Sequence, residues 1–430
     1  MKVVQLIPGA GNNFYCENCL RDHGLAKALR AQGHDALMVP LYLPIMTDTE
    51  NKNKTMPVFF GGINVYLQQK LKFFRNAPQW VDALFDHPRL LSWAAGLQGL
   101  TRPRDLAETT ISMLKGQDGH QAKELDKLID WLQNTLQPDM VHISNALLLG
   151  MARPIKEALG VPVVCTLQDE DIFIDPLPEP FRQQVWDLMA AQVPHVDGFI
   201  AVSDYYAQFM AERMRIPHEK LHRVYNGIDL NGHDAVHTLP ETPVIGFLER
   251  QCADKGLHTL VDAFIQLRSD KKFDDVRLRI AGGQTAEDAR YVRKQKRKLH
   301  RAGLQDAVDF LPNLSREEKL DFLHGLTLLS VPARHAEAFG IYILDALAAG
   351  VPVLLPEHGA FGEILGVTGG GTPYTPHNAE TLATHLAALL QAPETLLDLS
   401  RQGRLRVAQH FSIEEMARQF SAVLKRISAG

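Results

Sequence analysis

Two carboxylic acids eight positions apart stand in the segment of this chain that is richest in chemistry. Glu337 lies in a stretch without helical or strand periodicity, and Asp345 lies in the apolar run after Gly340. The pattern predicts a loop, a helix that begins near Ile341, and then a strand. Gly340 lets the backbone approach a ligand closely, and the unpaired amides of a helix N-terminus attract an anion. We therefore expect a diphosphate there, with both acids within reach of one ligand.

Two cations precede this segment. Arg250 and Lys255 follow a predicted strand, and Gly256 comes directly after them. A diphosphate leaving group gains negative charge as its bond breaks, and Arg and Lys can stabilise that charge without a metal ion. Such a pair is more often part of a solvated surface. Its place at a strand end, upstream of the acids, favours a binding site.

A glycine-rich turn follows the first predicted strand of the chain. It contains Gly11, Asn12 and Asn13 and leads into a predicted helix. The backbone of such a turn can cradle a phosphate or a second substrate. By itself, a glycine-rich first turn is a weak signal.

An acidic segment follows another predicted strand and reads Gln168-Asp169-Glu170-Asp171. Its carboxylates can orient a hydroxyl group or act as a general base, and Asp169 and Asp171 are the first candidates. The Asp-x-Asp spacing also suits a metal ion, but a solvated acidic loop is the commoner meaning. We predict no metal site here.

The cysteines are too few for a disulfide scaffold. A zinc or redox site is conceivable near the paired cysteines, but a complete tetrahedral set at standard spacing is missing. Small buried or half-buried side chains are the more common outcome. The four cysteines are Cys16, Cys19, Cys165 and Cys252.

Length and composition indicate a two-domain globular protein. The chain has 430 residues, of which 45% are hydrophobic and 22% charged. The formal net charge of -5 gives no general attraction to nucleic acid. No run of about 18 apolar residues is present, and the N-terminus has the pattern of a strand instead of a signal peptide. We expect a cytoplasmic protein.

Short β-branched runs alternate with amphipathic stretches, which predicts an α/β fold with doubly wound parallel sheets. The clearest helix covers residues 20–31 and ends at Gly33. The expected strands are 3–7, 36–39, 140–143, 161–167, 198–202, 221–225, 244–248, 276–281, 308–311, 326–331 and 351–355.

The alternation gives the domain boundaries. Residues 1–230 are expected to form an N-terminal domain, and the polar segment 231–243 is expected to be a linker. Residues 244–410 then form a second domain of similar design, and residues 411–430 form a helix that packs back toward the first. Two such sheets place their ligand loops in the cleft between the domains.

Two further segments leave alternatives open. Residues 41–136 interrupt the alternation with aromatic and basic side chains. They predict either extra helices on the first sheet or a surface that touches an acceptor or a membrane. Residues 290–301 predict a strongly basic helix, which is either a solvated face or a surface for an anionic membrane.

The motifs resemble those of a known family. The segment from Glu337 to Asp345 resembles the E-x7-E signature of the retaining glycosyltransferases of family 4, with Asp345 in place of the second Glu. Arg250 to Gly256 is similar to the family's Arg-x4-Lys-Gly loop. The likeness extends along nearly the whole chain and is strongest to bacterial members with a Gly-Ala-Gly-Asn loop followed by Cys-x2-Cys-Leu-Arg-Asp.

This resemblance implies a GT-B architecture, in which two Rossmann-like domains face each other across a cleft. It implies a sugar contact for Glu337 and a ribose contact for Asp345. Gln168 stands where many members have a His, and Glu363 stands where members have a Gly-rich loop followed by Glu, although Glu363 also suits a helix N-terminus. Catalytic residues would be Glu337, Arg250, Lys255 and Asp169. Donor contacts would come from Gly11, Arg250, Lys255, Gly282, Phe339, Gly340, Ile341, Tyr342 and Asp345. Acceptor-side candidates are Asn12, Asn13, Gln168 and Asp171.

The predicted function is that of a retaining glycosyltransferase in glycan or glycolipid biosynthesis. It would move a sugar from a nucleotide diphosphate sugar to a hydroxyl group of a glycan, lipid or small-molecule acceptor, without a cofactor or metal. Alternatives are a nucleotide-sugar epimerase, a phosphorylase, or a non-catalytic nucleotide-sugar binding protein. The nucleotide, sugar, acceptor, oligomeric state and any peripheral membrane contact are left open by the residues.

Overall fold

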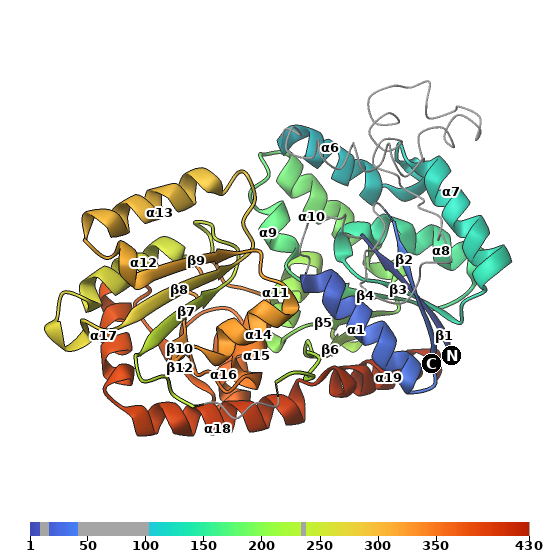
Figure 1. Ribbon diagram of the computed structural model, residues 1–430. Coiled ribbons are helices and arrows are strands. Elements are labelled where there is room, and N and C mark those ends of the chain that lie inside the picture. Colours follow the sequence, from blue (N-terminus) through green and yellow to red (C-terminus); the bar gives the residue numbers. More distant parts are fainter. Residues whose placement is uncertain (9–16, 42–102, 234–237, 430) are drawn as a thin grey trace. The chain divides into compact units, whose positions relative to one another are not determined.

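The chain folds into two compact units (Figure 1). A computed structural model describes residues 1–8, 17–41, 103–233 and 238–429. The N-terminal unit comprises Met1–Tyr225 and Ala417–Gly430, and the C-terminal unit comprises Asn226–Met416. The segment expected as a linker, 231–243, therefore falls within the C-terminal unit.

The N-terminal unit contains a six-stranded sheet in the order β2-β1-β3-β4-β5-β6, and every strand pair is parallel. Apolar residues point to both faces of its central strands, so that β3, β4 and β5 are buried along their whole length. Burial on both faces is typical of a parallel sheet between two helical layers. The strands are β1 (Lys2–Ile7), β2 (Asp35–Pro40), β3 (Met140–Ile143), β4 (Val163–Leu167), β5 (Gly198–Ala201) and β6 (Leu221–Arg223).

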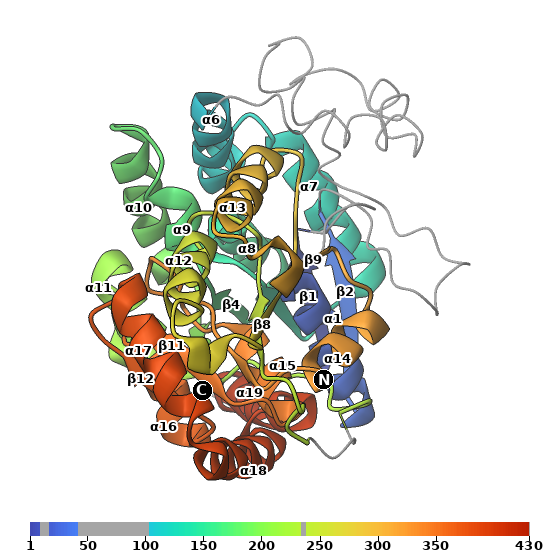
Figure 2. The ribbon, with the colours of Figure 1, turned by 60° about the vertical axis from the view of Figure 1, so that its left-hand side comes forward.

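Helices cover both faces of each sheet (Figures 1 and 2). In α11, Ser203 is the N-cap and its hydroxyl accepts a hydrogen bond from the amide of Tyr206 at 3.0 Å. Between Met1 and Tyr225, the described residues of this unit form the helices α1 (Glu17–Ala31), α6 (Pro103–Leu114), α7 (Ala122–Trp131), α8 (Ala152–Leu159), α9 (Glu170–Ile174), α10 (Phe181–Gln192) and α11 (Asp204–Met214).

The last helix, α19 (Ile413–Ala429), packs on the N-terminal sheet from Ala417 onward. The ring of Phe420 meets the buried ring of His142 of β3 edge to face, with centroids 5.0 Å apart. Ser421 Oγ lies 2.7 Å from Nε2 of His34, just before β2. These contacts make α19 part of the N-terminal core.

The C-terminal unit has a second parallel sheet, in the order β12-β11-β10-β7-β8-β9. Its central strand β7 is buried throughout and follows Pro243. The strands are β7 (Val244–Leu248), β8 (Arg277–Gly282), β9 (Val308–Pro312), β10 (Leu328–Leu329), β11 (Val353–Pro356) and β12 (Gly371–Tyr374).

The second sheet is likewise enclosed by helices. Helix α15 is apolar except for Tyr342 and Asp345, and it is buried almost throughout. The helices are α12 (Leu257–Leu267), α13 (Ala289–Arg301), α14 (Arg316–His324), α15 (Ile341–Ala348), α16 (Phe361–Thr368), α17 (Ala379–Leu390) and α18 (Pro393–His410).

The predicted α/β class with two parallel sheets is confirmed. The prediction missed β12, because Gly371-Thr-Pro-Tyr374 has no apolar pattern and becomes a strand by pairing with β11 at the sheet edge, where a proline is tolerated. The strand expected over 326–331 is reduced to two residues. Within 41–136, residues 103–136 supply α6 and α7, while residues 42–102 lie outside the described part. In the part of the chain that the structure describes, no helix is long and apolar enough to cross a membrane.

Phe420→Ala should destabilise the N-terminal unit by about 3–5 kcal/mol, because it empties a fully buried aromatic site. The measurement is the urea midpoint of unfolding. Leu405→Ala on α18 is the control, since Leu405 is 58% exposed and its truncation should change stability by less than about 0.5 kcal/mol. Equal effects of the two substitutions would show that α19 is not part of the core.

Candidate active site

Lys255 lies between two carboxylates in the C-terminal unit. Its Nζ is 2.6 Å from Oε1 of Glu249 and 2.8 Å from Oε1 of Glu337, which is 82 residues away in sequence. Burial opposes the charge on Lys255, but the two carboxylates outweigh it and raise its pKa well above the usual value. Lys255 is therefore a permanent cation, and the fold brings it together with Glu337.

Close backbone contacts set the conformation of the loop that carries Lys255. Gly256 has φ of +72°, and a Cβ at this position would lie 1.7 Å from the carbonyl oxygen of Pro332. Gly282 has φ of +113° and leaves no room for a Cβ against the carbonyl of Glu249. Only glycine allows the loops after β7, β8 and β10 to approach this closely.

Glu249 is the residue of this loop that sequence reasoning missed. One carboxylate oxygen binds Lys255, and the other accepts a short hydrogen bond from the amide of Arg250. Glu249 thereby joins both ends of the loop between β7 and α12. Its position at the end of β7 was the available signal, because side chains at the carboxyl ends of parallel strands converge on ligand loops.

Arg250 has a partner of its own. Its guanidinium donates to both oxygens of Asp288, from Nε at 3.0 Å and from Nη2 at 3.1 Å. Asp288 is buried and also accepts from the amide and the hydroxyl of Thr285. The hydrogen bonds to Asp288 raise the pKa of Arg250. Sequence reasoning missed Asp288, which stands directly before the basic helix α13.

The loop that carries Glu337 is packed against the loop that precedes α16. The carbonyl of Glu337 accepts from the amide of Ala360 at 3.1 Å, and a Cβ on Gly359 would lie 2.6 Å from the amide nitrogen of Glu337. The ring of His358 binds the carbonyl of Ala333 at 2.9 Å. Glu363 lies half-buried in the first turn of α16.

Helix α15 begins at Ile341, as predicted, with Gly340 as its N-cap at φ of +95°. Phe339 and Tyr342 are buried on either side of this start. Because their side chains are buried in the core, these two residues could contact a ligand through their backbone atoms and not through their rings. At this start the amide of Ile343 donates to the carbonyl of Gly340 at 3.1 Å, and the positive end of the helix dipole lies at Gly340.

Asp345 lies on α15 and is paired with a second lysine. Nζ of Lys319, on α14, lies 2.7 Å from Oδ2 of Asp345, and both side chains are largely buried. The imidazole of His233 is buried nearby, and burial lowers its pKa despite the attraction of Asp345. Sequence reasoning missed Lys319. The two acids of the motif are thus each neutralised by a different lysine.

The acceptor-side candidate Gln168 lies in the N-terminal unit, and both the nitrogen and the oxygen of its side-chain amide form hydrogen bonds within the protein. Its Nε2 donates to the carbonyl of Ser144 at 2.6 Å, and its Oε1 accepts from Arg21 on α1. Arg21 also pairs with Asp22. Gln168 therefore connects α1 with the loop after β3, in addition to any contact with a substrate.

Glu170 organises the acidic segment. Its fully buried carboxylate accepts from the amides of Ala146 at 3.0 Å and Gln168 at 2.7 Å, and from the hydroxyl of Tyr206 at 2.9 Å. Burial outweighs these bonds and raises the pKa of Glu170 to about 7. The group can change charge near neutral pH while it holds three segments together.

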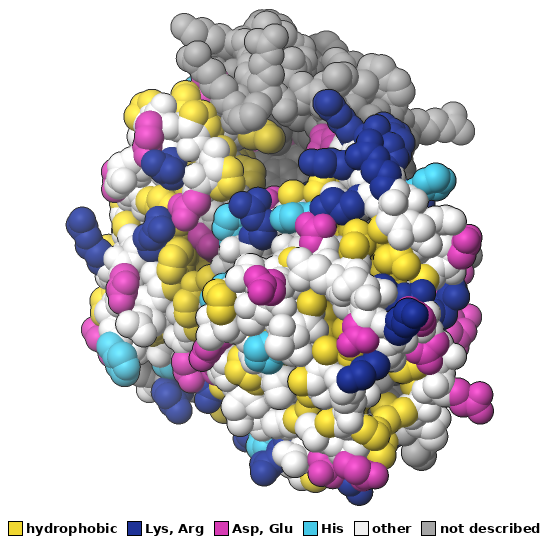
Figure 3. Space-filling view, turned by 90° about the vertical axis from the view of Figure 1, so that its left-hand side faces the viewer, with side chains coloured by type: hydrophobic (Ala, Val, Ile, Leu, Met, Phe, Trp, Pro, Cys, Tyr) yellow, Lys and Arg dark blue, Asp and Glu magenta, His cyan; other side chains and the backbone are white. Residues whose placement is uncertain are grey.

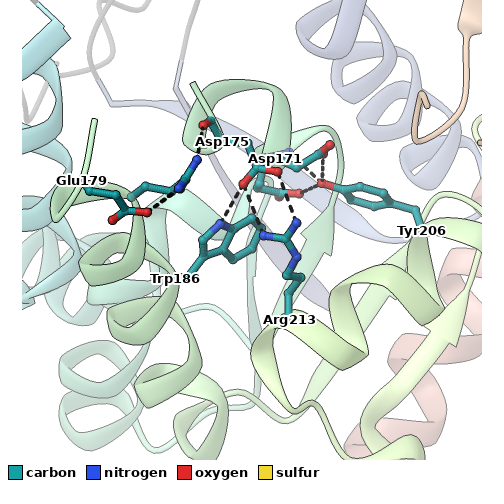
Figure 4. A network of polar contacts seen from close by, with 8 residues as sticks. Asp171, Asp175, Glu179, Trp186, Tyr206 and Arg213 are labelled. Carbon is teal, nitrogen blue, oxygen red and sulfur yellow. Dashed lines mark hydrogen bonds and ion pairs between the residues drawn. The ribbon is translucent and has the colours of Figure 1, made fainter. Parts of the chain in front are cut away.

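Asp171 points to the same tyrosine (Figure 4). The hydroxyl of Tyr206 lies 2.9 Å from Oδ1 of Asp171, and burial raises the pKa of that carboxyl. Behind it, Asp175 accepts from the indole of Trp186 at 3.0 Å and pairs with Arg213 at 3.3 Å. Asp169 has φ of +54° and is half-buried just before α9. Among the described residues no group of acids, histidines or cysteines is arranged to hold a metal ion.

Several predicted residues lie outside the described part of the chain. They are Gly11, Asn12, Asn13 and Cys16, together with the side chain of Cys19. Cys165 is a free thiol buried in β4, and Cys252 is a free, half-buried thiol in the loop between β7 and α12. Burial raises the pKa of both thiols. The two belong to different units.

A separate pocket of about 280 Å³ lies in the N-terminal unit among α6, α10 and the turn that follows α6. Most of its lining comes from the segment 41–136. None of the predicted site residues is among those that line it, which are Glu108, Ile111, Ser112, Lys115, Asp118, Gly119, His120, Phe181 and Gln184.

Comparison with known proteins identifies the reaction class. Residues 233–406 match the family of group 1 glycosyl transferases, and residues 112–231 match glycosyltransferase family 4. The chain is a GT-B glycosyltransferase, similar to those of family 4. The predicted enzyme class is confirmed.

Relatives of this glycosyltransferase act on different substrates. The MMP α-(1→4)-mannosyltransferase of Mycolicibacterium hassiacum is 24% identical over 311 residues, which cover 68% of this chain and 71% of that protein. The glycogen synthase of Mycobacterium tuberculosis is 24% identical over 342 residues, which cover 78% of this chain and 80% of that protein.

Solved structures share the fold of this glycosyltransferase. HepE of Anabaena, in complex with UDP, aligns with a TM-score of 0.69 at 18% identity over 99% of this chain and 100% of that chain. Sucrose-phosphate synthase from Thermosynechococcus elongatus aligns with a TM-score of 0.72 at 16% identity over 100% of this chain and 99% of that chain. These matches confirm the predicted GT-B fold class.

Gly256→Ala should cost about 2–4 kcal/mol of unfolding free energy, because it adds a backbone clash with Pro332 to the strain of a positive φ. Gly303→Ala is the matched control. Gly303 has nearly the same φ, +71°, with no atom within 4 Å of the added Cβ, so only the strain of about 1 kcal/mol remains. Urea unfolding measures both. Equal losses would mean that Pro332 does not constrain the loop.

Glu170→Gln should remove a pH dependence of stability. The folded state keeps a proton on Glu170 from its ordinary pKa of 4.5 up to about 7, whereas the unfolded state loses it, so the contribution of Glu170 to wild-type stability falls as pH rises through that window. The slope contributed by one proton is about -1.4 kcal/mol per pH unit.

Urea unfolding between pH 4.5 and 7.5 measures that slope, whatever the absolute stability of the Glu170→Gln variant. Glu179→Gln, at an exposed glutamate paired with Arg182, should leave the slope unchanged. A Glu170→Gln variant with the wild-type slope would contradict the raised pKa.

Proposed function

We propose that this glycosyltransferase transfers a sugar, with retention of configuration, from a nucleotide diphosphate sugar to an acceptor hydroxyl. The ion pair between Lys255 and Glu337 is the observation that supports this most directly. It places a permanent cation beside an acid at the start of the loop that leads into α15. A leaving diphosphate needs the cation, and a donor sugar offers hydroxyl groups to the acid.

The donor diphosphate would bind between the Lys255 loop and the N-terminus of α15. Lys255 is already paired with Glu249 and Glu337, so the phosphate oxygens would share its protons with those carboxylates. Arg250, which is 43% exposed beside Asp288, can turn part of its guanidinium to the same ligand. These charges and the amides after Gly340 can balance the diphosphate, and the proposed reaction uses no metal.

The two acids of the motif would bind the two ends of the donor, the sugar and the nucleoside. Glu337 would bind hydroxyl groups of the sugar, and Asp345 would bind the ribose. Lys319 pairs with Asp345 at 2.7 Å and so fixes where this side chain lies. A carboxylate accepts hydrogen bonds only, which suits the paired hydroxyl groups of a ribose.

A uridine diphosphate sugar is the first donor to test, since HepE was solved with UDP. The acceptor would be a glycan, a lipid or a small molecule, in glycan or glycolipid biosynthesis in the cytoplasm. Asn12, Asn13, Gln168 and Asp171 are the acceptor-side candidates. Asp169 is the proposed base, because it is half-buried just before α9, at the carboxyl end of β4.

A panel of nucleotide diphosphates and their sugars tests the donor by thermal stabilisation. A ligand at 100 times its Kd adds about 2.7 kcal/mol, which raises Tm by about 5–10 °C in a unit of this size. One clear responder should be lost in Lys255→Ala and kept in Lys271→Ala, a control at an exposed lysine of the same unit.

Activity with that donor should fall about 100-fold or more in Lys255→Ala, because stabilisation of the leaving group is lost. Glu337→Gln should bind the diphosphate yet discriminate poorly among its sugars. A panel without any responder, or a response that Lys255→Ala retains, would exclude the proposed donor site.

A further inference from the structure

Helix α13 presents a face that is entirely basic. The helix contains no acidic residue, and its buried positions are Val292, Gln295 and Leu299. Figure 3 shows Lys and Arg side chains gathered on the face of the molecule that carries this helix. Six of its cations are exposed to solvent: Arg290, Arg293, Lys294, Lys296, Arg297 and Arg301.

The cations are aligned by the helical repeat. At about 100° per residue, five of the six fall within an arc of about 100°, centred opposite the buried stripe. Over the twelve residues from Arg290 to Arg301 the helix rises about 16 Å. The result is one flat, outward-facing row of charge, and only Lys296, which lies over the ring of Phe310 at 4.6 Å, stands apart.

Little in the described chain neutralises this row. Among the described residues, the cation of α13 that forms an ion pair is Lys298, which is not part of the row. Its Nζ lies 2.6 Å from Oδ1 of Asp262 on α12. Glu287 precedes the helix and lies 4.0 Å from Arg250. The helix therefore keeps a concentrated positive field within a chain whose net charge is -5.

We propose that this face of α13 docks the enzyme on an anionic lipid surface. Each Lys or Arg near such a surface strengthens binding about fivefold. A row of charge along one outward-facing helix face suits a planar surface. Nucleic acid fits less well, because the row carries no aromatic side chain for base stacking and the chain as a whole is acidic. Tyr291 is engaged with His258 inside the unit.

Docking would be electrostatic, without insertion. The apolar stripe of α13 is buried against its own unit, so it offers nothing to the hydrocarbon layer. Binding should therefore weaken steeply with salt, as the Debye length falls from about 10 Å at 0.1 M to about 3 Å at 1 M. This inference does not depend on the donor or on the reaction proposed above.

Co-sedimentation of the full chain with vesicles tests the proposal. We expect binding to vesicles of phosphatidylcholine with 30% phosphatidylglycerol, no binding to phosphatidylcholine alone, and release at high salt. Arg293→Gln/Arg297→Gln, at the centre of the row, should weaken binding about 25-fold. Lys271→Gln/Lys272→Gln removes the same charge from an exposed turn of the same unit and should change binding less than about twofold.

Three results would overturn the proposal: no binding of the full chain to anionic vesicles at low salt, equal weakening by the two double substitutions, or preferential binding of duplex DNA through Arg293 and Arg297. Unchanged thermal unfolding of both variants shows that they are folded. Because both retain Lys255 and Glu337, their response to nucleotide diphosphates tests the donor site separately.

Discussion

The C-terminal unit of this enzyme has at its candidate site a single lysine held between two carboxylates. Lys255 can occupy that place because Gly256 allows the chain to pass against Pro332, and because Glu249 closes the loop at its other end. Glu337 is brought to the same point by the loop after β10 and supported by Gly359. Removing any one of these contacts changes where the cation stands, and with it the site that a diphosphate would meet.

The same principle of paired charge recurs through the molecule. Arg250 with Asp288 and Lys319 with Asp345 each combine a cation with a buried acid on another element. Buried charges are tolerated only when they are paired and hydrogen-bonded. Glu170 in the N-terminal unit differs, because neutral donors surround its carboxylate, and its pKa rises instead. Arg250 and Asp345, which the proposed reaction would use, are thus held in place by Asp288 and Lys319, which have no direct part in it.

Much of the fold and part of the site followed from local pattern. The eleven expected strands, of which β10 is shortened, and the start of α15 follow from apolar runs, which a doubly wound sheet requires along the chain itself. β12 was not predicted because its strand character comes from pairing with the neighbouring β11. Asp288, Glu249 and Lys319 were not predicted for a related reason. Their ion pairs join residues on different elements, and such a pair produces no characteristic spacing in the sequence.

The sequence by itself determined the α/β class, the glycosyltransferase motifs and the identities of Arg250, Lys255, Glu337 and Asp345, because these depend on residue type and on short-range order. Only the tertiary structure decided which charges meet. It paired Lys255 with Glu337 across 82 residues and gave Asp345 a different lysine. It also turned five cations of α13 outward. Distances between elements come from packing, and packing is set by the whole unit at once.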